Sequence, residues 1–392
     1  MRVGARLQQR GSVSLFIVVF SALLIITMTT AFIRIMLQDQ QQATANDLSR
    51  SALDSAYAGV EDAKRAIVAY YENNCDKDPN TTACSNLKNL SDPTNVDGTG
   101  WTRNCDITEK THVASLTHQE VLVNTAANDN QFNQAYTCVK VQLDPDSYVG
   151  KLKANTSTII PLQVQDGQSF EKIKIEWYAQ QDGSSVDVVT PTPSLPFPKS
   201  ASASWPQNRP SVIRAQLLQY DKDDGFKLSD FDNAKYNSTL FLYPLKLSAE
   251  NTTSSFGLES RRTDSAAREP EYVQCLDFSP SDEYACRTTI AAPAPGSSSS
   301  NRIAYLNLIQ VYSTPTTYRV TLLDASGDSV KFSGVQPVVD STGRSNDLFR
   351  RVQSRITLGT AAAPDATVDI TDKLCKTFTV TDTSYVEGKC GS

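Results

Sequence analysis

The sequence predicts an α+β protein in which a long N-terminal helix, half transmembrane and half amphipathic, packs on mainly antiparallel β-sheet domains stapled by disulfides. Two patterns carry this prediction: an uninterrupted helical segment from about residue 12 to residue 72, and period-two strand segments beyond it. All eight cysteines lie after the apolar segment, which indicates an oxidising compartment. The 392 residues, 40% of them apolar, are enough for two or three domains.

The N-terminal segment predicts a membrane anchor. Residues 1–11, MRVGARLQQRG, carry three arginines and no acid, so this end is expected in the cytoplasm and the rest of the chain outside it. Residues 13–33 then contain no charge, no Pro and no Gly. About 20 such residues span the hydrocarbon core of a bilayer as a helix, which predicts a transmembrane helix over residues 12–36.

Residues 37–72 are predicted to continue the same helix. They contain no proline and a single glycine, Gly59, and their apolar residues recur every three or four positions from Ala45 to Tyr70. This spacing gives one apolar face. Asn73, Asn74 and the DKDPN sequence follow and end the helix, so we expect one continuous helix of about 90 Å.

The region past residue 73 alternates apolar and polar residues over short segments, which favours half-buried antiparallel strands. A proline-rich stretch at residues 191–210 is expected to be an extended linker. It separates an N-terminal β portion, residues 73–190, from a C-terminal β portion, residues 211–392; one sheet with insertions is the alternative. The predicted strands are residues 137–143, 171–178, 212–220, 238–247, 303–312, 317–323, 349–357 and 376–381.

The cysteines fall into near-neighbour pairs along the chain, which predicts four disulfides rather than metal ligands. The chain has no Cys-x-x-Cys motif, the usual spacing of a structural zinc site. The predicted pairs are Cys75 with Cys84, Cys105 with Cys138, Cys275 with Cys286, and Cys375 with Cys390.

The sequence carries no recognisable catalytic or cofactor motif, and we expect neither enzymatic activity nor a cofactor. Its only histidines are His112 and His118, and the net charge of -6 without a basic cluster past residue 11 argues against a nucleic-acid partner. The acidic stretch with Asp221, Asp223 and Asp224 is a weak calcium candidate. A solvated Asp-Gly turn is the favoured interpretation.

Gly11 stands between Arg10 and the apolar run, an arrangement that resembles the prepilin peptidase site, which is cut after Gly on the cytoplasmic face. Together with the half-membrane, half-amphipathic helix and the DSAYAGVEDAKRAIVAY sequence of residues 54–70, it makes the N-terminus similar to type IV minor pilins and pseudopilins of the PilX and GspK type. The resemblance covers about 70 of the 392 residues. It implies that residues 1–11 are a prepilin leader and that the mature chain begins at Ser12, although Ser replaces the commoner Phe or Met.

The fifth residue of that mature chain is Phe16, where most pilins carry Glu. In those pilins the carboxylate compensates the N-terminal amine of a neighbouring subunit inside the membrane-embedded part of the filament. Subunits without it are the ones placed at filament tips, and the resemblance implies the same position here. A membrane protein that never enters a filament is the alternative interpretation of Phe16.

The function that the resemblance implies is that of a structural minor pilin or pseudopilin in a type IV pilus-like filament, which acts in pilus assembly and surface attachment. Its implied partners are the cytoplasmic membrane, other pilins, the prepilin peptidase and the pilus assembly platform. The implied location is the cytoplasmic membrane, with a single pass, and the cell exterior after assembly. Alternatives are a membrane-anchored adhesin that never polymerises and a type II secretion pseudopilin. The residues implied in membrane and filament docking are Val13, Leu15, Phe16 and Ile17.

Overall fold

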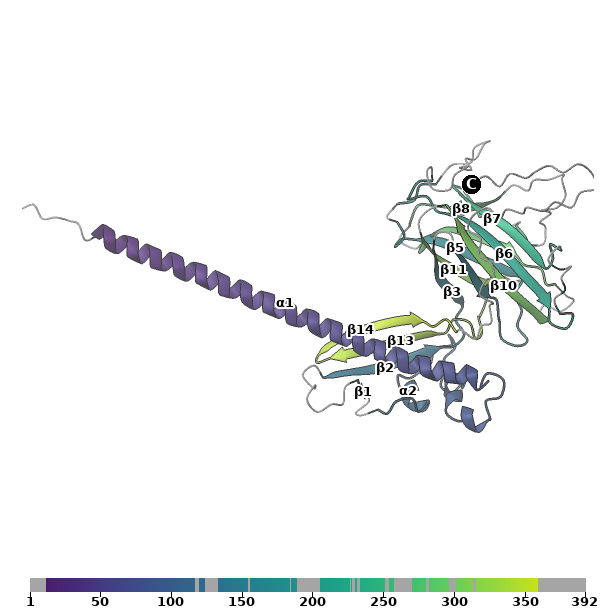
Figure 1. Ribbon diagram of the computed structural model, residues 1–392, viewed down its shortest axis with the longest axis horizontal. Helices are drawn as coiled ribbons and strands as arrows, with labels where there is room; N and C mark the ends of the chain where they lie inside the picture. The colour runs from purple at the N-terminus through teal and green to yellow at the C-terminus, as the bar shows by residue number, and fades with distance from the viewer. Residues whose placement is uncertain are drawn as a thin grey trace, which may run out of the picture. The chain divides into compact units, whose positions relative to one another are not determined.

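The computed structural model shows two compact units, described here separately (Figure 1). Unit 1 is formed by residues 1–97, 102–141 and 339–354, and unit 2 by residues 98–101, 142–338 and 355–392. The residues that the structure describes are 12–116, 120–123, 133–153, 156–183, 185–188, 205–225, 227, 230, 233–250, 254–256, 270–279, 282–295, 301–312 and 315–358.

Helix α1 (Ser12–Glu72) is a single uninterrupted helix of 61 residues, with the bounds that the sequence predicts. Its C-terminus is capped by the two asparagines that follow it. Asn74 has a positive φ of 54°, which Asn tolerates better than most residues. This lets the Asn74 amide donate to the Tyr71 carbonyl and the Cys75 amide to the Tyr70 carbonyl, both at 3.0 Å, the pattern of a Schellman cap.

Unit 1 combines the C-terminal half of α1 with a four-stranded sheet in the order β1-β2-β13-β14. Short helical turns, η1 (Thr82–Cys84), η2 (Leu87–Leu90) and α2 (Ile107–Lys110), lie between α1 and the first strand. Disulfides join Cys75 to Cys84 and Cys105 to Cys138. The sheet strands are β1 (Val121–Leu122), β2 (Gln134–Gln142), β13 (Val338–Ser345) and β14 (Leu348–Arg355).

Unit 2 is a ten-stranded, barrel-like sheet with the strand order β12-β11-β5-β9-β8-β7-β6-β10-β4, and β3 pairs with β11. Its described strands pair antiparallel, except that β7 and β8 run parallel. The Cys275–Cys286 disulfide joins the neighbouring strands β8 and β9. The strands are β3 (Ser147–Leu152), β4 (Ser157–Pro161), β5 (Lys172–Ala179), β6 (Val212–Asp221), β7 (Asn237–Leu245), β8 (Glu271–Cys275), β9 (Tyr284–Ala291), β10 (Arg302–Val311), β11 (Thr316–Leu323) and β12 (Ser329–Val330).

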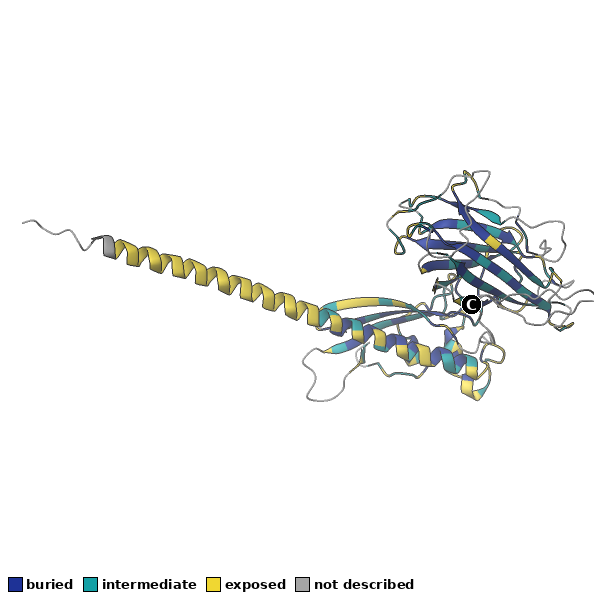
Figure 2. Cartoon of the chain, turned by 45° about the horizontal axis from the view of Figure 1, so that its top comes forward, coloured by how far each residue is buried: buried dark blue, intermediate teal, exposed yellow. Residues whose placement is uncertain are grey.

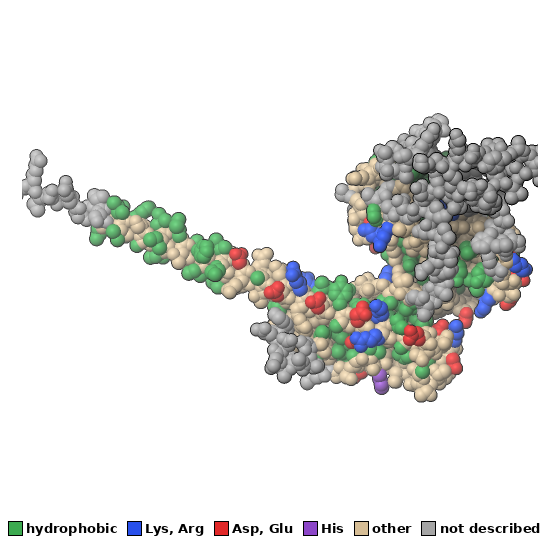
Figure 3. Space-filling view, viewed as in Figure 1, with side chains coloured by type: hydrophobic (Ala, Val, Ile, Leu, Met, Phe, Trp, Pro, Cys, Tyr) green, Lys and Arg blue, Asp and Glu red, His purple; other side chains and the backbone are tan. Residues whose placement is uncertain are grey.

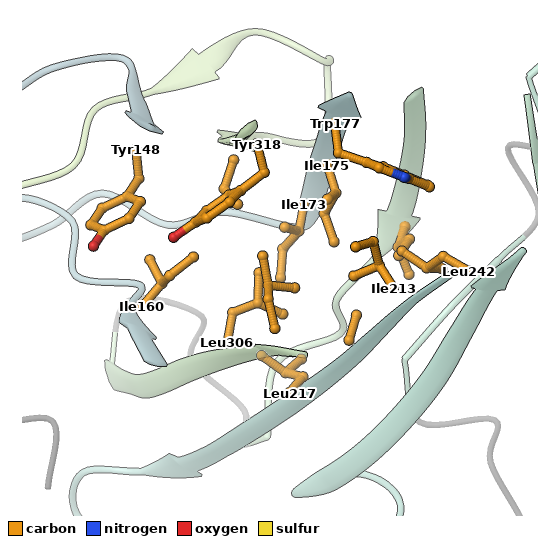
Figure 4. Close-up of a cluster of buried hydrophobic side chains, with 14 of the residues drawn as sticks. Tyr148, Ile160, Ile173, Ile175, Trp177, Ile213, Leu217, Leu242, Leu306 and Tyr318 are labelled. Carbon is orange, nitrogen blue, oxygen red and sulfur yellow. The ribbon is translucent and has the colours of Figure 1, made fainter. Parts of the chain in front are cut away.

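The core of unit 2 explains why its sheet curls. Side chains from both ends of the strand order point into one apolar cluster (Figure 4). Tyr148 of β3 stacks on Tyr318 of β11 with ring centroids 6.3 Å apart, and Ile160 of β4 is fully buried in the same cluster. Each of these strands has one apolar face, and curling lets a single sheet cover that face without a second layer.

The predicted domain boundary at residues 191–210 is wrong. Strands from both sides of it, such as β5 and β6, belong to the same sheet, so the alternative of one sheet with insertions describes unit 2. The units instead divide near residues 141 and 338. Seven of the eight predicted strands are present within about three residues of their predicted ends, and residues 376–381 lie outside the described part of the chain.

Candidate functional site on helix α1

The N-terminal half of α1 presents an apolar surface on all sides. Every described side chain from Leu15 to Leu37 is exposed, as Figure 2 shows along this part of the helix, and most of them are hydrophobic (Figure 3). Among the predicted docking residues, Phe16 is 75% exposed, Leu15 71% and Ile17 60%. Transfer of each such side chain out of water contributes about 1.5–3 kcal/mol, so this surface requires apolar surroundings.

The hydroxyl side chains of Ser21, Thr27, Thr29 and Thr30 in this segment are satisfied within the helix. The hydroxyls of Ser21, Thr29 and Thr30 donate to backbone carbonyls four residues earlier at 2.7 Å, and that of Thr27 donates to the Leu24 carbonyl at 2.9 Å. In hydrocarbon no water is present to accept these bonds. The segment therefore meets the polar requirement of a membrane span, and α1 is long and apolar enough to cross a membrane.

A polar segment separates the apolar surface from the folded part of unit 1. Residues 38–47, QDQQQATAND, are exposed on every side. At about 1.5 Å per residue they form roughly 15 Å of exposed helix. The predicted apolar face therefore begins later than Ala45, which is exposed; Leu48 is the first partly buried residue. Nearby, the Arg350 Nε donates to the Ser49 Oγ at 2.8 Å.

The C-terminal half of α1 is fixed to the sheet by a seam of small residues. Ala52, Ala56, Ala63 and Ile67 are fully buried or nearly so. A Cβ atom at Gly343 of β13 would overlap the Ala52 carbonyl and the Ala56 nitrogen. The helix backbone therefore lies directly against the strand, and this closeness requires Ala on one side and Gly on the other.

Polar contacts fix the rotation of α1 on the same sheet. The Tyr136 hydroxyl of β2 donates to the Asp62 carboxylate at 2.7 Å, and Arg65 pairs with the other oxygen of Asp62 at 3.2 Å. Burial and then the bond to Asp62 raise the pKa of Tyr136, so the phenol stays protonated and keeps donating. The amide of Gln134 donates to the Ser51 hydroxyl.

The remaining predicted site residues are placed as follows. Ser12 is the first residue of α1; Gly11 and the side chain of Val13 lie outside the described part, as do Cys375 and Cys390. The other six cysteines form the three disulfides that the sequence predicts. Gly343 and Arg350 were not predicted as part of this site, because they become neighbours of α1 only through pairing of distant segments.

The acidic turn proposed as a weak calcium candidate is organised by an amide. The Asn301 side chain donates to the Asp221 carboxylate at 3.0 Å and also to that of Asp223, and Gly225 takes a positive φ of 64°. The sequence favours a solvated Asp-Gly turn here over a calcium site, and the positive φ of Gly225 is typical of such a turn. Within the described residues no group of three or more acidic, Cys or His side chains is placed to hold a metal ion.

No protein-family model matches the chain, and no curated protein matches it.

Proposed function

We propose that the chain is a structural subunit anchored by one membrane helix, a minor pilin or pseudopilin of a type IV pilus-like filament. One observation carries the proposal: α1 is a single helix whose first half is apolar and exposed while its second half is seated in a folded unit. Such a helix attaches a folded domain rigidly to an apolar segment that can be buried in a membrane or among other helices. The first 70 residues resemble the pilin leader and helix, which supports the same reading.

The mechanism is helix packing rather than turnover. In the cytoplasmic membrane, lipid tails surround residues 15–37; in a filament, the apolar helices of neighbouring subunits do so. Because lipid tails are about as apolar as leucine side chains, the hydrophobic effect favours neither surrounding strongly, and close packing decides the transfer. The pilus assembly platform and other pilins are the implied partners, and the folded units become extracellular on assembly.

A position at the filament tip follows from Phe16. An uncompensated charge in hydrocarbon is costly, by several kcal/mol in most estimates, so a subunit that docks beneath others benefits from a carboxylate at this position. A subunit with Phe there has no group to compensate a neighbour's N-terminal amine. We therefore place it where no subunit lies above it, with a role in initiating assembly and in surface attachment.

The proposal is tested by the N-terminal mass of the protein isolated from its native membrane. Cleavage after Gly11 removes residues 1–11 and leaves Ser12 as the first residue. Gly11→Val is expected to abolish that cleavage because the peptidase site requires Gly, whereas Gly4→Val, in the same leader, leaves it unchanged. A native protein that retains Met1, with residues 1–11 still present in all three forms, would contradict the pilin interpretation.

A second candidate is a single-pass adhesin or binding module that never polymerises, and Phe16 is the observation that favours it. A pseudopilin of a type II secretion system is a third. Immunogold labelling of filaments sheared from the cell separates the pilus subunit from both alternatives: label at filament ends supports the pilus, and label confined to the cell envelope supports one of the other two.

A further inference from the structure

The sheet of unit 1 ends in a regular strand whose outer edge is open. β14 is the last strand in the order β1-β2-β13-β14, and among the described residues no strand pairs with its outer side. It is eight residues long and largely exposed (Figure 2). The two-residue turn at Asn346 and Asp347 places Ser345 opposite Leu348, so the backbone groups of Phe349, Arg351 and Gln353 point away from β13.

The opposite edge of the same sheet is covered by the chain itself. β1 pairs with the first part of β2, matching Val121 to Tyr136. Further along, the Val139 amide donates to the Cys105 carbonyl at 3.2 Å, and the Thr102 amide donates to the Val141 carbonyl at 2.9 Å. The Cys105–Cys138 disulfide holds that covering segment in place. One edge is thus protected along most of its length, by β1 and by the segment that carries Thr102 and Cys105.

The open edge is basic. The sequence of β14, LFRRVQSR, contains three arginines and no acid. Arg351 pairs with Asp340 of β13, yet its side chain remains 73% exposed; Arg350 lies on the helix side and contacts Ser49. Charged residues on an edge strand prevent indiscriminate pairing, and like charges opposite each other disfavour pairing of this strand with a second β14. A strand with acidic side chains is not repelled by these arginines and can pair with β14.

We propose that β14 is a docking edge that accepts an extended acidic segment of another protein as a fifth strand of the unit 1 sheet. Backbone hydrogen bonds to Phe349, Arg351 and Gln353 supply affinity, and the arginines select acidic side chains. This inference is independent of the proposed function, because it depends only on the sheet edge and its charge.

The test measures peptide binding to the full chain in detergent micelles by fluorescence anisotropy. The probe is a labelled eight-residue peptide that alternates Val with Glu, and the matched probe carries Lys in place of Glu. Gln353→Pro removes one outward amide without breaking a bond to β13, and Arg351→Gln removes one charge. Arg65→Gln, an exposed arginine of α1, is the matched charge control.

The acidic peptide is expected to bind, and the basic one is not. Gln353→Pro is expected to weaken binding about tenfold or more, Arg351→Gln to weaken it severalfold, and Arg65→Gln to leave it unchanged. The proposal is overturned if the acidic peptide fails to bind at millimolar concentration, if both peptides bind alike, or if Arg351→Gln and Arg65→Gln have equal effects. A dimer that Gln353→Pro dissociates also overturns it, because the occupant is then a second copy.

Discussion

At Gly343 of β13, the sheet of unit 1 lies directly against the backbone of α1. Backbone contact of this kind leaves no room for a side chain, and the obstructing atoms belong to the helix backbone, which cannot rotate away. Gly59 of α1 faces a softer neighbour, because its nearest contact is the hydroxyl of Ser341, which can change rotamer. The two glycines therefore differ in how strictly the fold requires them.

Gly343→Ala is expected to destabilise unit 1 by about 3 kcal/mol, the upper part of the range for overpacking a tight site. Gly98→Ala is the matched control, since a Cβ there meets no atom within 4 Å. Its effect is expected to stay within about 1 kcal/mol. Urea unfolding of both variants measures the difference, and equal midpoints would show that α1 is not seated through Gly343.

Glu176 of β5 is a buried carboxylate, 6% exposed, whose charge depends on Arg319 of β11. Burial alone raises the pKa of Glu176, but the hydrogen bond and charge of Arg319, at 2.7 Å, together with Lys174 outweigh it. The pKa is held below its ordinary value of 4.5. A carboxyl with a lowered pKa stabilises the fold above its ordinary pKa and loses that contribution as the pH falls through the lowered value.

Arg319→Met is expected to lower the stability of unit 2 at pH 7 by about 3 kcal/mol, because it leaves a buried carboxylate with one cation fewer. The difference from the parent protein should shrink below pH 4 as Glu176 takes up a proton. Lys151→Met, at an exposed position of β3, is the control. Melting temperatures recorded between pH 3 and pH 7 test this; a difference that is constant with pH contradicts the assigned role of Glu176.

Helix α1 consists of three consecutive segments that differ in polarity and burial. Residues 15–37 are exposed and, apart from Arg34 and a few hydroxyl side chains, apolar; residues 38–47 are mainly polar and exposed, and the seam from Ala52 to Ile67 is buried. The polar middle holds the folded unit away from the apolar surface, by roughly 15 Å at the usual helical rise. The first segment should therefore tolerate no charge at its centre, while the middle should accept one freely.

Ile25→Asp, in the centre of the apolar segment at a position that is 63% exposed, tests this division. A carboxylate there is expected to disfavour insertion by about 2.5–3.5 kcal/mol, whereas Gln41→Asp in the polar segment should have no effect. The measurement is the fraction of protein that remains in membranes after alkaline carbonate extraction. Equal retention of both variants would mean that residues 15–37 do not span the bilayer.

Most of the strands that the sequence predicts have a regular apolar face; the exposed, arginine-rich β14 is an exception. β6 and β10 alternate without interruption because one side of each faces the core of unit 2. β13 was missed because its sequence, VVDSTGRS, reads as a turn. Its small and polar residues allow α1 to approach the strand closely. The same residues lack the alternating apolar pattern by which a strand is predicted from sequence. The apolar half of α1 could be predicted, because it is a continuous pattern in the sequence. The seam between α1 and β13 could not, because it depends on contact between segments far apart in the chain.

At the scale of the whole molecule, unit 2 is inserted into unit 1. The chain leaves unit 1 after β2 and returns to it with β13, about 200 residues later. No local feature of the sequence encodes that return, whereas the proline-rich stretch at residues 191–210 has the composition of a linker and so predicts a boundary in the wrong place. Each unit has its own sheet and its own disulfides, so each should respond separately to loss of its own crosslink.

Differential scanning calorimetry of the full chain is expected to resolve two transitions. Replacing Cys275 and Cys286 together by Ala should lower only the transition of unit 2, and replacing Cys105 and Cys138 should lower only that of unit 1, each by roughly 3 kcal/mol or more in the chain-entropy account. The two double variants are controls for each other. A single transition that both variants shift equally would show that the units unfold as one.

The insertion of unit 2 also determines the order in which the parts of unit 1 are synthesised. The strand that seats α1 belongs to a segment that leaves the ribosome some 270 residues after the helix seam itself. During synthesis, the alanine seam of α1 still has no sheet to cover it, and unit 2 can complete its own core in that interval. The last step of folding is then the arrival of β13 and β14, so a stalled or truncated synthesis product keeps a folded unit 2 behind a helix that has not yet docked.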